Sequence, residues 1–306
     1  STSKGRTRPS ERCDARKIDL EEFGFDVHFS FRPNSHTKYH EENMSDLKVA
    51  VIIPAAGQGT RFGGDKLGQD LGGRPLLLRT VELFTKRDEV SAIVVAAPPE
   101  SIDDFRSRYG AQLGFHGVII VAGGRSERWE SVRNALAVVP NDCTHIAVHD
   151  AARPGANDAL LTRIFDAARV AAAVVPGDPV SSTLKRVTVE TFAAAPDEAV
   201  ADAILGDAGR ESVRGRRVES TVDRTRLMAI QTPQIFSADV MRRAYAQSDL
   251  AGATDDAMLV ERLGENVLVV EGDPRNIKVT TTADLAIVRA ILGHRAPEER
   301  PAHKRF

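Results

Sequence analysis

The residues with the clearest chemical potential lie between residues 47 and 66, where an apolar run gives way to small residues and two cations. The run 48–53 is largely apolar and β-branched, which is typical of a strand buried on both faces. It is followed by Pro54, Ala55, Ala56, Gly57, Gly59 and Thr60. Small residues after a buried strand let the backbone approach a ligand closely and direct N–H groups at phosphate. Arg61 and Lys66 add two positive charges, so this loop could hold a polyphosphate.

Two better-known phosphate-binding motifs do not fit this loop. Gly57, Gly59 and Gly63 are spaced one residue too widely for the dinucleotide fingerprint G-x-G-x-x-G. The loop also lacks the Gly-Lys-Ser/Thr ending of the P-loop. Glycine-rich turns are common in α/β proteins, so this loop alone does not identify a ligand. The ligand has to be inferred from the other motifs of the chain.

The composition narrows the possible functions. A chain of 306 residues has room for one large or two small domains. A formal net charge of −2 and 5% aromatic residues argue against nucleic acid as a partner. No apolar run approaches the length of a membrane span, so we predict no membrane association. Cys13 and Cys143 form neither a disulfide framework nor a metal motif, which predicts a reducing, cytoplasmic location.

Strand and helix patterns alternate from residue 47 onward. Strands are expected at 48–53, 91–96, 117–121, 144–148 and 171–175, and helices at 75–87, 98–109, 126–139 and 158–170. This alternation predicts an α/β fold with a Rossmann-like, mainly parallel sheet flanked by helices. Ligands of such sheets bind beyond the carboxyl ends of the strands. The loops at Pro54, Gly123 and Asp150 should therefore meet at one site.

The regular pattern is interrupted between residues 176 and 234 and then resumes. Strand-like segments at 179–189 and 218–222 enclose a long excursion, which predicts a protruding β-arm over about 179–224 with an insertion at about 192–217. Helices are then expected from Ser237 and Thr254, strands at 266–270 and 276–280, and a last helix begun by a Thr281–Asp284 capping box. We expect residues 1–46 to be a disordered extension without the apolar core of a secretory signal, and residues 294–306 to be a flexible tail.

Six short motifs follow one another along the chain. They are PAAGQGTR (54–61), Gly123-Gly124 with Arg128 and Ser131, HDAARP (149–154), TVDR (221–224), QTPQ (231–234) and NIKVT (276–280). Together, over about residues 47–293, they resemble the 2-C-methyl-D-erythritol 4-phosphate cytidylyltransferase family of the non-mevalonate isoprenoid pathway. The resemblance implies a nucleotidyltransferase-type fold and transfer of CMP from CTP to methylerythritol phosphate with release of pyrophosphate. It also implies Mg²⁺, bound mainly through the CTP phosphates, and a homodimer formed through the arm.

The resemblance assigns roles to specific residues. The catalytic residues would be the cations Arg61, Lys66 and Lys278. The nucleotide would contact Pro54, Ala55, Ala56, Gly57, Gly59, Thr60, Gly124, Arg128, Ser131, Asp150 and Ala151. The acceptor would contact Asp150, Arg153, Thr183, Arg224 and Thr232, with Thr183 and Arg224 supplied to the other subunit's site by the arm. No side chain is expected to be a metal ligand.

Ordinary structural roles remain open for several of these residues. Lys278 could be a solvated lysine at the end of a strand, and Ser131 could be a plain helix residue. Asp150 and Arg153 could form a local ion pair that braces their turn, and His149 is expected to be structural rather than catalytic.

The chain also departs from the family pattern in three places. Lys66 lies in an atypical loop, which leaves its register open. One extra residue between Gly124 and Arg128 makes Arg125 a competitor for the role of Arg128. The segment between Lys185 and Arg224 is longer than usual.

Two other functions compete with methylerythritol phosphate cytidylyltransferase. The first is a cytidylyltransferase that acts on ribitol 5-phosphate or another pentitol phosphate, against which Pro54 and Ala152 argue because such relatives tend to have other residues there. The second is a catalytically silent nucleotide-binding protein, against which the three candidate cations argue.

Overall fold

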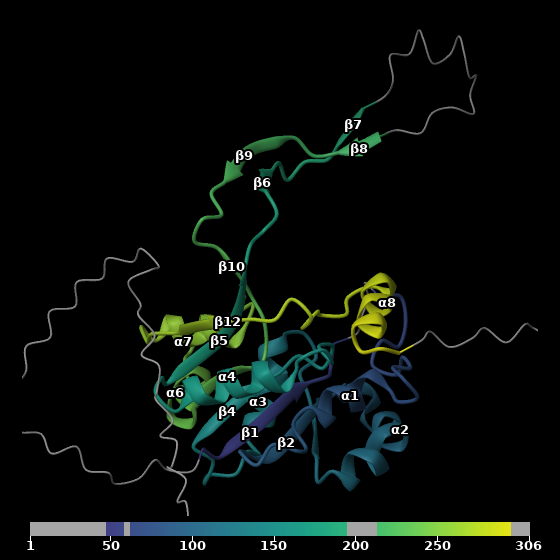
Figure 1. Ribbon diagram of the computed structural model, residues 1–306, viewed down its shortest axis with the longest axis vertical. Helices are drawn as coiled ribbons and strands as arrows, with labels where there is room; N and C mark the ends of the chain where they lie inside the picture. The colour runs from purple at the N-terminus through teal and green to yellow at the C-terminus, as the bar shows by residue number, and fades with distance from the viewer. Residues whose placement is uncertain (1–46, 58–61, 195–212, 295–306) are drawn as a thin grey trace, which may run out of the picture. The chain divides into compact units, whose positions relative to one another are not determined.

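A computed structural model describes residues 47–57, 62–194 and 213–294, all of which lie in one compact unit, residues 43–306 (Figure 1). The predicted N-terminal extension, 1–46, lies outside the described residues. So do most of the predicted insertion (195–212) and all but the first residue of the predicted tail. None of the helices in the described part of the chain has the length and apolarity that a bilayer crossing requires.

A single eight-stranded sheet forms the centre of the described fold. Its strands are β1 (Val49–Pro54), β2 (Val90–Ala97), β3 (Ile119–Ala122), β4 (His145–Val148), β5 (Ala173–Pro179), β10 (Met228–Ile230), β11 (Gln234–Ser237) and β12 (Leu268–Glu271). Their order is β10-β5-β11-β4-β1-β2-β3, and β12 also pairs with β5. The pairs β1–β2, β1–β4, β2–β3 and β5–β12 are parallel, whereas β10 and β11 run antiparallel to their neighbours. The predicted mainly parallel sheet is therefore confirmed.

Helices cover both faces of this sheet. They are α1 (Leu76–Glu82), α2 (Ile102–Phe115, preceded by the 3-10 turn Pro99–Ser101), α3 (Arg128–Leu136), α4 (Asp158–Ala168), α6 (Ala238–Tyr245) and α7 (Asp256–Arg262). The last helix, α8 (Thr282–Ile291), packs into a separate small cluster instead. Because side chains alternate along a strand, Val51 and Ile53 of β1 pack with α1, α2 and α4, whereas Ala50 and Ile52 pack with α3, α6 and α7. Burial on both sides explains why β1 reads as a continuous apolar run.

The predicted arm contains two small sheets of its own. β6 (Leu184–Val187) pairs antiparallel with β9 (Val218–Val222), and β7 (Phe192–Ala194) pairs antiparallel with β8 (Val213–Gly215). Neither pair belongs to the central sheet. The chain thus leaves the central sheet after β5 and returns to it at β10.

One predicted strand is absent, and four strands were not predicted: β7 and β8, which lie within the predicted insertion, and β10 and β11. Residues 276–280 are extended but form no ladder, because backbone groups of this segment bond to the turn that follows β4. Val279 N–H donates to Ala152 O at 2.8 Å, and Arg153 Nη1 donates to Asn276 O at 2.7 Å. β10 and β11 are only three and four residues long, too short for alternation to show in the sequence.

Helix boundaries also differ from the prediction, and α1 ends at Glu82 instead of at residue 87. α2 continues to Phe115, beyond its predicted end at Tyr109, because the fully buried Leu113 compensates for the helix-weakening Gly110. The predicted capping box is confirmed: Thr281 Oγ1 accepts from Asp284 N–H, and the Asp284 carboxylate accepts from Thr281 N–H at 2.7 Å.

Candidate functional site

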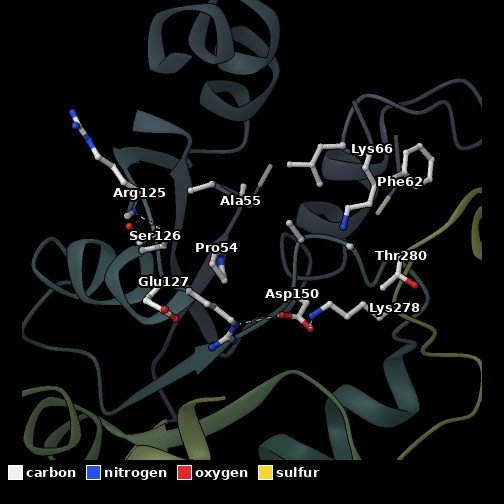
Figure 2. Close-up of a pocket in the computed structure, with 18 residues that line it drawn as sticks. Pro54, Ala55, Phe62, Lys66, Arg125, Ser126, Glu127, Asp150, Lys278 and Thr280 are labelled. Carbon is white, nitrogen blue, oxygen red and sulfur yellow. Dashed lines mark hydrogen bonds and ion pairs between the residues drawn. The ribbon is translucent and has the colours of Figure 1, made fainter. Parts of the chain in front are cut away.

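A pocket of about 530 Å³ lies where the loops after β1, β3 and β4 meet (Figure 2). Its lining comes from these three loops, from the start of α3 and from the segment before α8. The residues are Pro54, Ala55, Ala56, Gly57, Phe62, Lys66, Leu67, Gly124, Arg125, Ser126, Glu127, Arg128, Ser131, Asp150, Ala151, Ala152, Lys278 and Thr280. The structure thus brings together eleven of the residues assigned a role from the sequence, at the sheet edge where ligands of α/β proteins bind.

The loop after β3 packs so closely against the loop after β1 that only glycine fits. A Cβ atom at Gly123 would lie 2.7 Å from Ala56 Cβ and 2.8 Å from Ser131 Oγ. At Gly124 it would lie 2.2 Å from Glu130 Cβ. Gly124 N–H donates to Ser131 Oγ at 2.9 Å. The serine hydroxyl therefore fixes the glycine loop in the wall of the pocket, a structural role beside the predicted nucleotide contact.

The N-terminus of α3 faces the same pocket and is held by its own carboxylates. Glu127 and Glu130 form a capping box, and Glu130 also accepts from Ser126 N–H at 3.0 Å. The backbone N–H groups of Ser126 and then of Glu127 lower the pKa of Glu130, so its carboxylate stays charged. The cap keeps residues 124–127 in place along the pocket.

Asp150 is the electrostatic centre of the site. Its carboxylate lies 2.9 Å from Lys278 Nζ, 3.2 Å from Arg153 Nε and 3.6 Å from Arg128 Nε. Burial opposes ionisation, but the charges of Arg128, Lys278 and Arg153 outweigh it and hold the Asp150 pKa well below its usual range. Figure 2 shows Lys278 reaching Asp150 directly, with the Lys66 amine extending into the same pocket.

The two arginines near the glycine loop differ in surroundings. Arg128 pairs with Asp150 and, at 2.8 Å, with Asp256 Oδ2. Burial disfavours its charge, but Asp256 and then Asp150 outweigh this and raise the Arg128 pKa. Arg125 is 80% exposed, lies 3.5 Å from Glu100 and points away from Asp150 (Figure 2). Both line the pocket, but Arg128 is the one that contacts its central carboxylate.

His149 and Arg153 build the turn that carries Asp150. The His149 ring is fully buried, with Nε2 2.9 Å from Arg153 O and Nδ1 3.2 Å from Thr232 Oγ1. Burial lowers the pKa of His149 to about 4, so the ring is neutral at pH 7. Arg153 braces the turn through Asp150 and Asn276, as the ion-pair alternative anticipated, and does not line the pocket.

The remaining predicted residues lie elsewhere. Thr232 is buried, and its hydroxyl accepts from Asp150 N–H at 3.0 Å, so it holds the turn in place. Thr183 and Arg224 are exposed and do not line this pocket. Gly59, Thr60 and Arg61 lie outside the described residues, so their assignments stay predictions.

Both lysines of the pocket adjoin one small apolar cluster, which we call the C-terminal cluster. It contains Leu71, Leu76, Ala152, Val279, Leu285 and Val288, with Phe62, Leu67, Ile277 and Leu292 packed against it. Leu67 follows Lys66, and Ile277 and Val279 flank Lys278. Helix α8 supplies Leu285 and Val288, so this last helix supports both lysine-bearing segments.

Sequence reasoning missed several residues of the site. Phe62, Leu67, Ser126, Glu127, Ala152 and Thr280 also line the pocket. Ala152 and Thr280 lie inside the motifs 149–154 and 276–280, and the other four lie beside or between motif residues. Asp256, which pairs with Arg128, gave a weaker signal. It is the first residue of α7, and an acidic residue at that position is ordinarily explained by its favourable interaction with the helix dipole.

Known proteins resemble this chain over most of its length. The family model described as "IspD: 2-C-methyl-D-erythritol 4-phosphate cytidylyltransferase" matches residues 49–202 and 190–294. The 2-C-methyl-D-erythritol 4-phosphate cytidylyltransferase of Frankia casuarinae is 41% identical over 264 residues, which cover 85% of this chain and 87% of that protein. The protein of the same name from Rhodococcus jostii is 39% identical over 254 residues, covering 81% and 98%.

Solved structures give the same result. The crystal structure of 2-C-methyl-D-erythritol 4-phosphate cytidylyltransferase from Thermus thermophilus has a TM-score of 0.59 at 30% identity, covering 81% of this chain and all of that one. A crystal structure of 4-diphosphocytidyl-2C-methyl-D-erythritol synthase has a TM-score of 0.60, also at 30% identity, covering 80% and 98%. The pocket, its cations and these relatives agree, and the chain belongs to the 2-C-methyl-D-erythritol 4-phosphate cytidylyltransferase family.

Proposed function

We propose that this protein transfers CMP from CTP to 2-C-methyl-D-erythritol 4-phosphate, forming 4-diphosphocytidyl-2-C-methyl-D-erythritol and pyrophosphate. Family membership supports the reaction. The observation that carries it here is the pocket that Lys66, Lys278 and Arg128 line together with the small residues at the carboxyl end of β1. Such a pocket suits a nucleoside triphosphate, since cations meet the phosphates and close backbone approach suits the base.

The reaction needs charge neutralisation rather than a base. An oxygen of the acceptor phosphate attacks the α-phosphorus of CTP in line, a new P–O bond forms, and the α–β bridging bond breaks to release pyrophosphate. The attacking oxygen is already anionic near neutral pH, so no proton has to be removed. Arg61, Lys66 and Lys278 then stabilise the charge that develops around the α-phosphate. His149, neutral and buried behind the pocket, is not required.

The nucleotide half of the site comes from the loops after β1 and β3. Backbone groups of Pro54, Ala55, Ala56 and Gly57, together with Gly124 and Ser131, hold the cytosine, and Gly59 and Thr60 continue the phosphate loop. Arg128, Asp150 and Ala151 complete the nucleotide contacts. Support comes from the packing of Gly123 on Ala56, which is so close that a side chain at residue 123 is excluded, so the two loops meet with small residues only.

The acceptor half comes from Asp150 and Arg153, from Thr232, and from Thr183 and Arg224 of a second subunit. The exposed arm residues Thr183 and Arg224 do not line the pocket of their own chain, which is what a contribution to a partner's site requires. Arg224 suits a phosphate because its planar guanidinium donates two parallel hydrogen bonds. A homodimer through the arm is therefore part of the proposal. Thr232 acts through the Asp150 turn that its hydroxyl supports.

A divalent cation is expected from the family chemistry, and we propose Mg²⁺. Two carboxylates line the pocket. Asp150 is already paired with three cations, and Glu127 caps α3. In the described part of the chain no three His, Cys, Asp or Glu side chains gather as metal ligands. These residues fit an ion held mainly by the CTP phosphates, where it would neutralise their charge.

The test is pyrophosphate release by the purified protein with Mg²⁺, CTP and one acceptor at a time. We expect release with 2-C-methyl-D-erythritol 4-phosphate and little with ribitol 5-phosphate. The reverse preference would overturn the substrate, and no release with either acceptor would favour a silent nucleotide-binding protein. A cytoplasmic location belongs to the same proposal, consistent with the buried free thiol of Cys143.

A further inference from the structure

The Arg128 guanidinium lies between two carboxylates from different parts of the fold. Its Nη1 lies 2.8 Å from Asp256 Oδ2, and its Nε lies 3.6 Å from Asp150 Oδ1. Asp150 lines the pocket, whereas Asp256 does not and its side chain has no solvent exposure. Because Asp256 cannot touch a ligand, any effect it has on binding must pass through Arg128.

Asp256 is held in place by contacts from α6 to its carboxylate and from β11 to its backbone. Asp256 is the first residue of α7. Tyr245, the last residue of α6, donates its hydroxyl to Asp256 Oδ1 at 2.6 Å. The backbone N–H of Asp256 donates to Gln234 Oε1, on β11, at 3.2 Å. One carboxylate oxygen therefore accepts a hydrogen bond from Tyr245 and the other forms the ion pair with Arg128, which makes Asp256 a fixed negative charge behind the pocket wall.

Asp256 also determines how the charges around Asp150 are shared. Asp150 already pairs with Lys278 at 2.9 Å and with Arg153 at 3.2 Å. Without Asp256, the Arg128 guanidinium would pair with Asp150 alone and would compete with Lys278 for its carboxylate. A guanidinium anchored on Asp256 instead keeps its remaining N–H groups available to the pocket.

We propose that Asp256 is a positioning residue for the nucleotide: it anchors Arg128 in the pocket wall so that the guanidinium can meet CTP while Lys278 keeps its contact with Asp150. The inference rests on the proposed function, since it takes CTP as the ligand. Tyr245 supports the same arrangement from behind Asp256.

The primary test is Asp256→Asn, which keeps the size of the side chain and removes its charge. We expect the Kd for CTP, measured by calorimetry with Mg²⁺, to rise about tenfold, equivalent to about 1.4 kcal/mol. The KM for CTP should rise similarly, with a smaller change in kcat and an unchanged KM for the acceptor.

The matched control is Asp255→Asn, one residue earlier. The Asp255 carboxylate caps α7 through Met258 N–H at 3.1 Å and accepts from Gln234 Nε2 at 2.7 Å, but has no ion pair with Arg128. Asparagine is also a good helix cap, so α7 should persist. We expect Asp255→Asn to bind CTP as the unaltered protein does.

Tyr245→Phe provides a second variant should Asp256→Asn fail to fold. It keeps the buried ring and removes only the hydroxyl donor, so the Kd for CTP should rise a few-fold in the same direction. In an Arg128→Ala background, adding Asp256→Asn should change the Kd no further, because Asp256 acts through Arg128.

Two results would overturn the inference. One is unchanged CTP binding in both Asp256→Asn and Tyr245→Phe. The other is an equal weakening by Asp256→Asn with and without Arg128. Failure of the proposed function would look different, since the unaltered protein would then release no pyrophosphate in the acceptor assay.

Discussion

At the scale of single residues, the site consists of one carboxylate and three cations that come from distant parts of the chain. Asp150 meets Arg128 from α3, Arg153 from its own turn and Lys278 from the segment before α8. Its side chain is only 10% exposed, so water screens these contacts poorly. The carboxylate therefore holds three mutually repelling cations in one small volume.

Asp150→Asn should destabilise the protein and abolish most of its activity. The substitution leaves Lys278 and Arg153 without their carboxylate and leaves Arg128 only Asp256, which should lower the free energy of unfolding by about 3 kcal/mol in urea titrations. The control is Asp142→Asn, because Asp142 pairs with Lys48 at the surface with its side chain 65% exposed. That variant should unfold like the unaltered protein, and equal losses in the two variants would contradict the role given to Asp150.

His149 should make stability depend on pH below neutrality. Its folded-state pKa of about 4 lies below the ordinary value of 6.5, so only the unfolded chain takes up the proton between these values. The stabilisation is complete above pH 6.5 and is lost as pH falls toward 4, by about 3 kcal/mol from this group. The unfolding free energy of His149→Asn should fall less over this range, with His145, whose pKa burial also lowers, contributing part of the remaining slope. Identical pH dependence in both proteins would contradict this.

The sequence predicted which residues gather at the pocket better than it predicted their contacts. Lys66, Lys278, Arg128 and Asp150 all line it, because strand-end loops of a parallel sheet converge. The second partner of Arg128 was not foreseen, since the pairing with Asp256 depends on how α6 and α7 pack behind the sheet. Long-range side-chain partners of this kind have no local signature.

At the scale of elements, α8 supports the segments that carry Lys66 and Lys278, although no residue of α8 lines the pocket. Its Leu285 and Val288 fill the C-terminal cluster beneath the segments that carry Lys66 and Lys278. Arg289 Nη2 also donates to Asp70 O at 2.8 Å, which ties α8 to the loop after Lys66. In Figure 1 this helix lies above α1, the element that contributes Leu76 to the cluster.

Leu285→Ala should therefore lower both stability and turnover. The cavity should cost about 3 kcal/mol of unfolding free energy, and loosening of the lysine segments should reduce kcat about tenfold under conditions where the variant stays folded. The control is Leu113→Ala on α2, an equally buried leucine of the cluster formed with α1 and α4. It should lose similar stability and keep its kcat, and a parallel loss of kcat would contradict the role of α8.

Secondary structure was predictable in segments where apolar residues recur regularly or form a continuous run. The helices and the four parallel strands of the first half were found because most of them bury a regular face. β3, which has no buried residue, was found as a short apolar run. The segment 276–280 looked like a strand because Ile277 and Val279 alternate with polar residues. Both pack instead into the C-terminal cluster, and the backbone bonds to a turn, so tertiary contacts replaced the ladder.

At the scale of the whole molecule, the proposed shared site can be tested by mixing inactive variants. Lys278→Ala impairs the main part of a site, and Arg224→Ala impairs the arm that serves its partner. After subunit exchange, a mixed dimer contains one complete site, so about a quarter of the activity should return because half of the dimers are mixed. Exchange confirmed by mass spectrometry without recovery would contradict the contribution of the arm to a second subunit.

The position of β11 also has a consequence for synthesis on the ribosome. β11 begins at Gln234 yet lies between β4, which ends at Val148, and β5. While the nascent chain is shorter than this, β4 and β5 each present an unpaired edge toward the place that β11 will occupy. The amino-terminal half therefore cannot complete its sheet until β11 has been synthesised, and we expect premature termination in the arm to leave an open, aggregation-prone product.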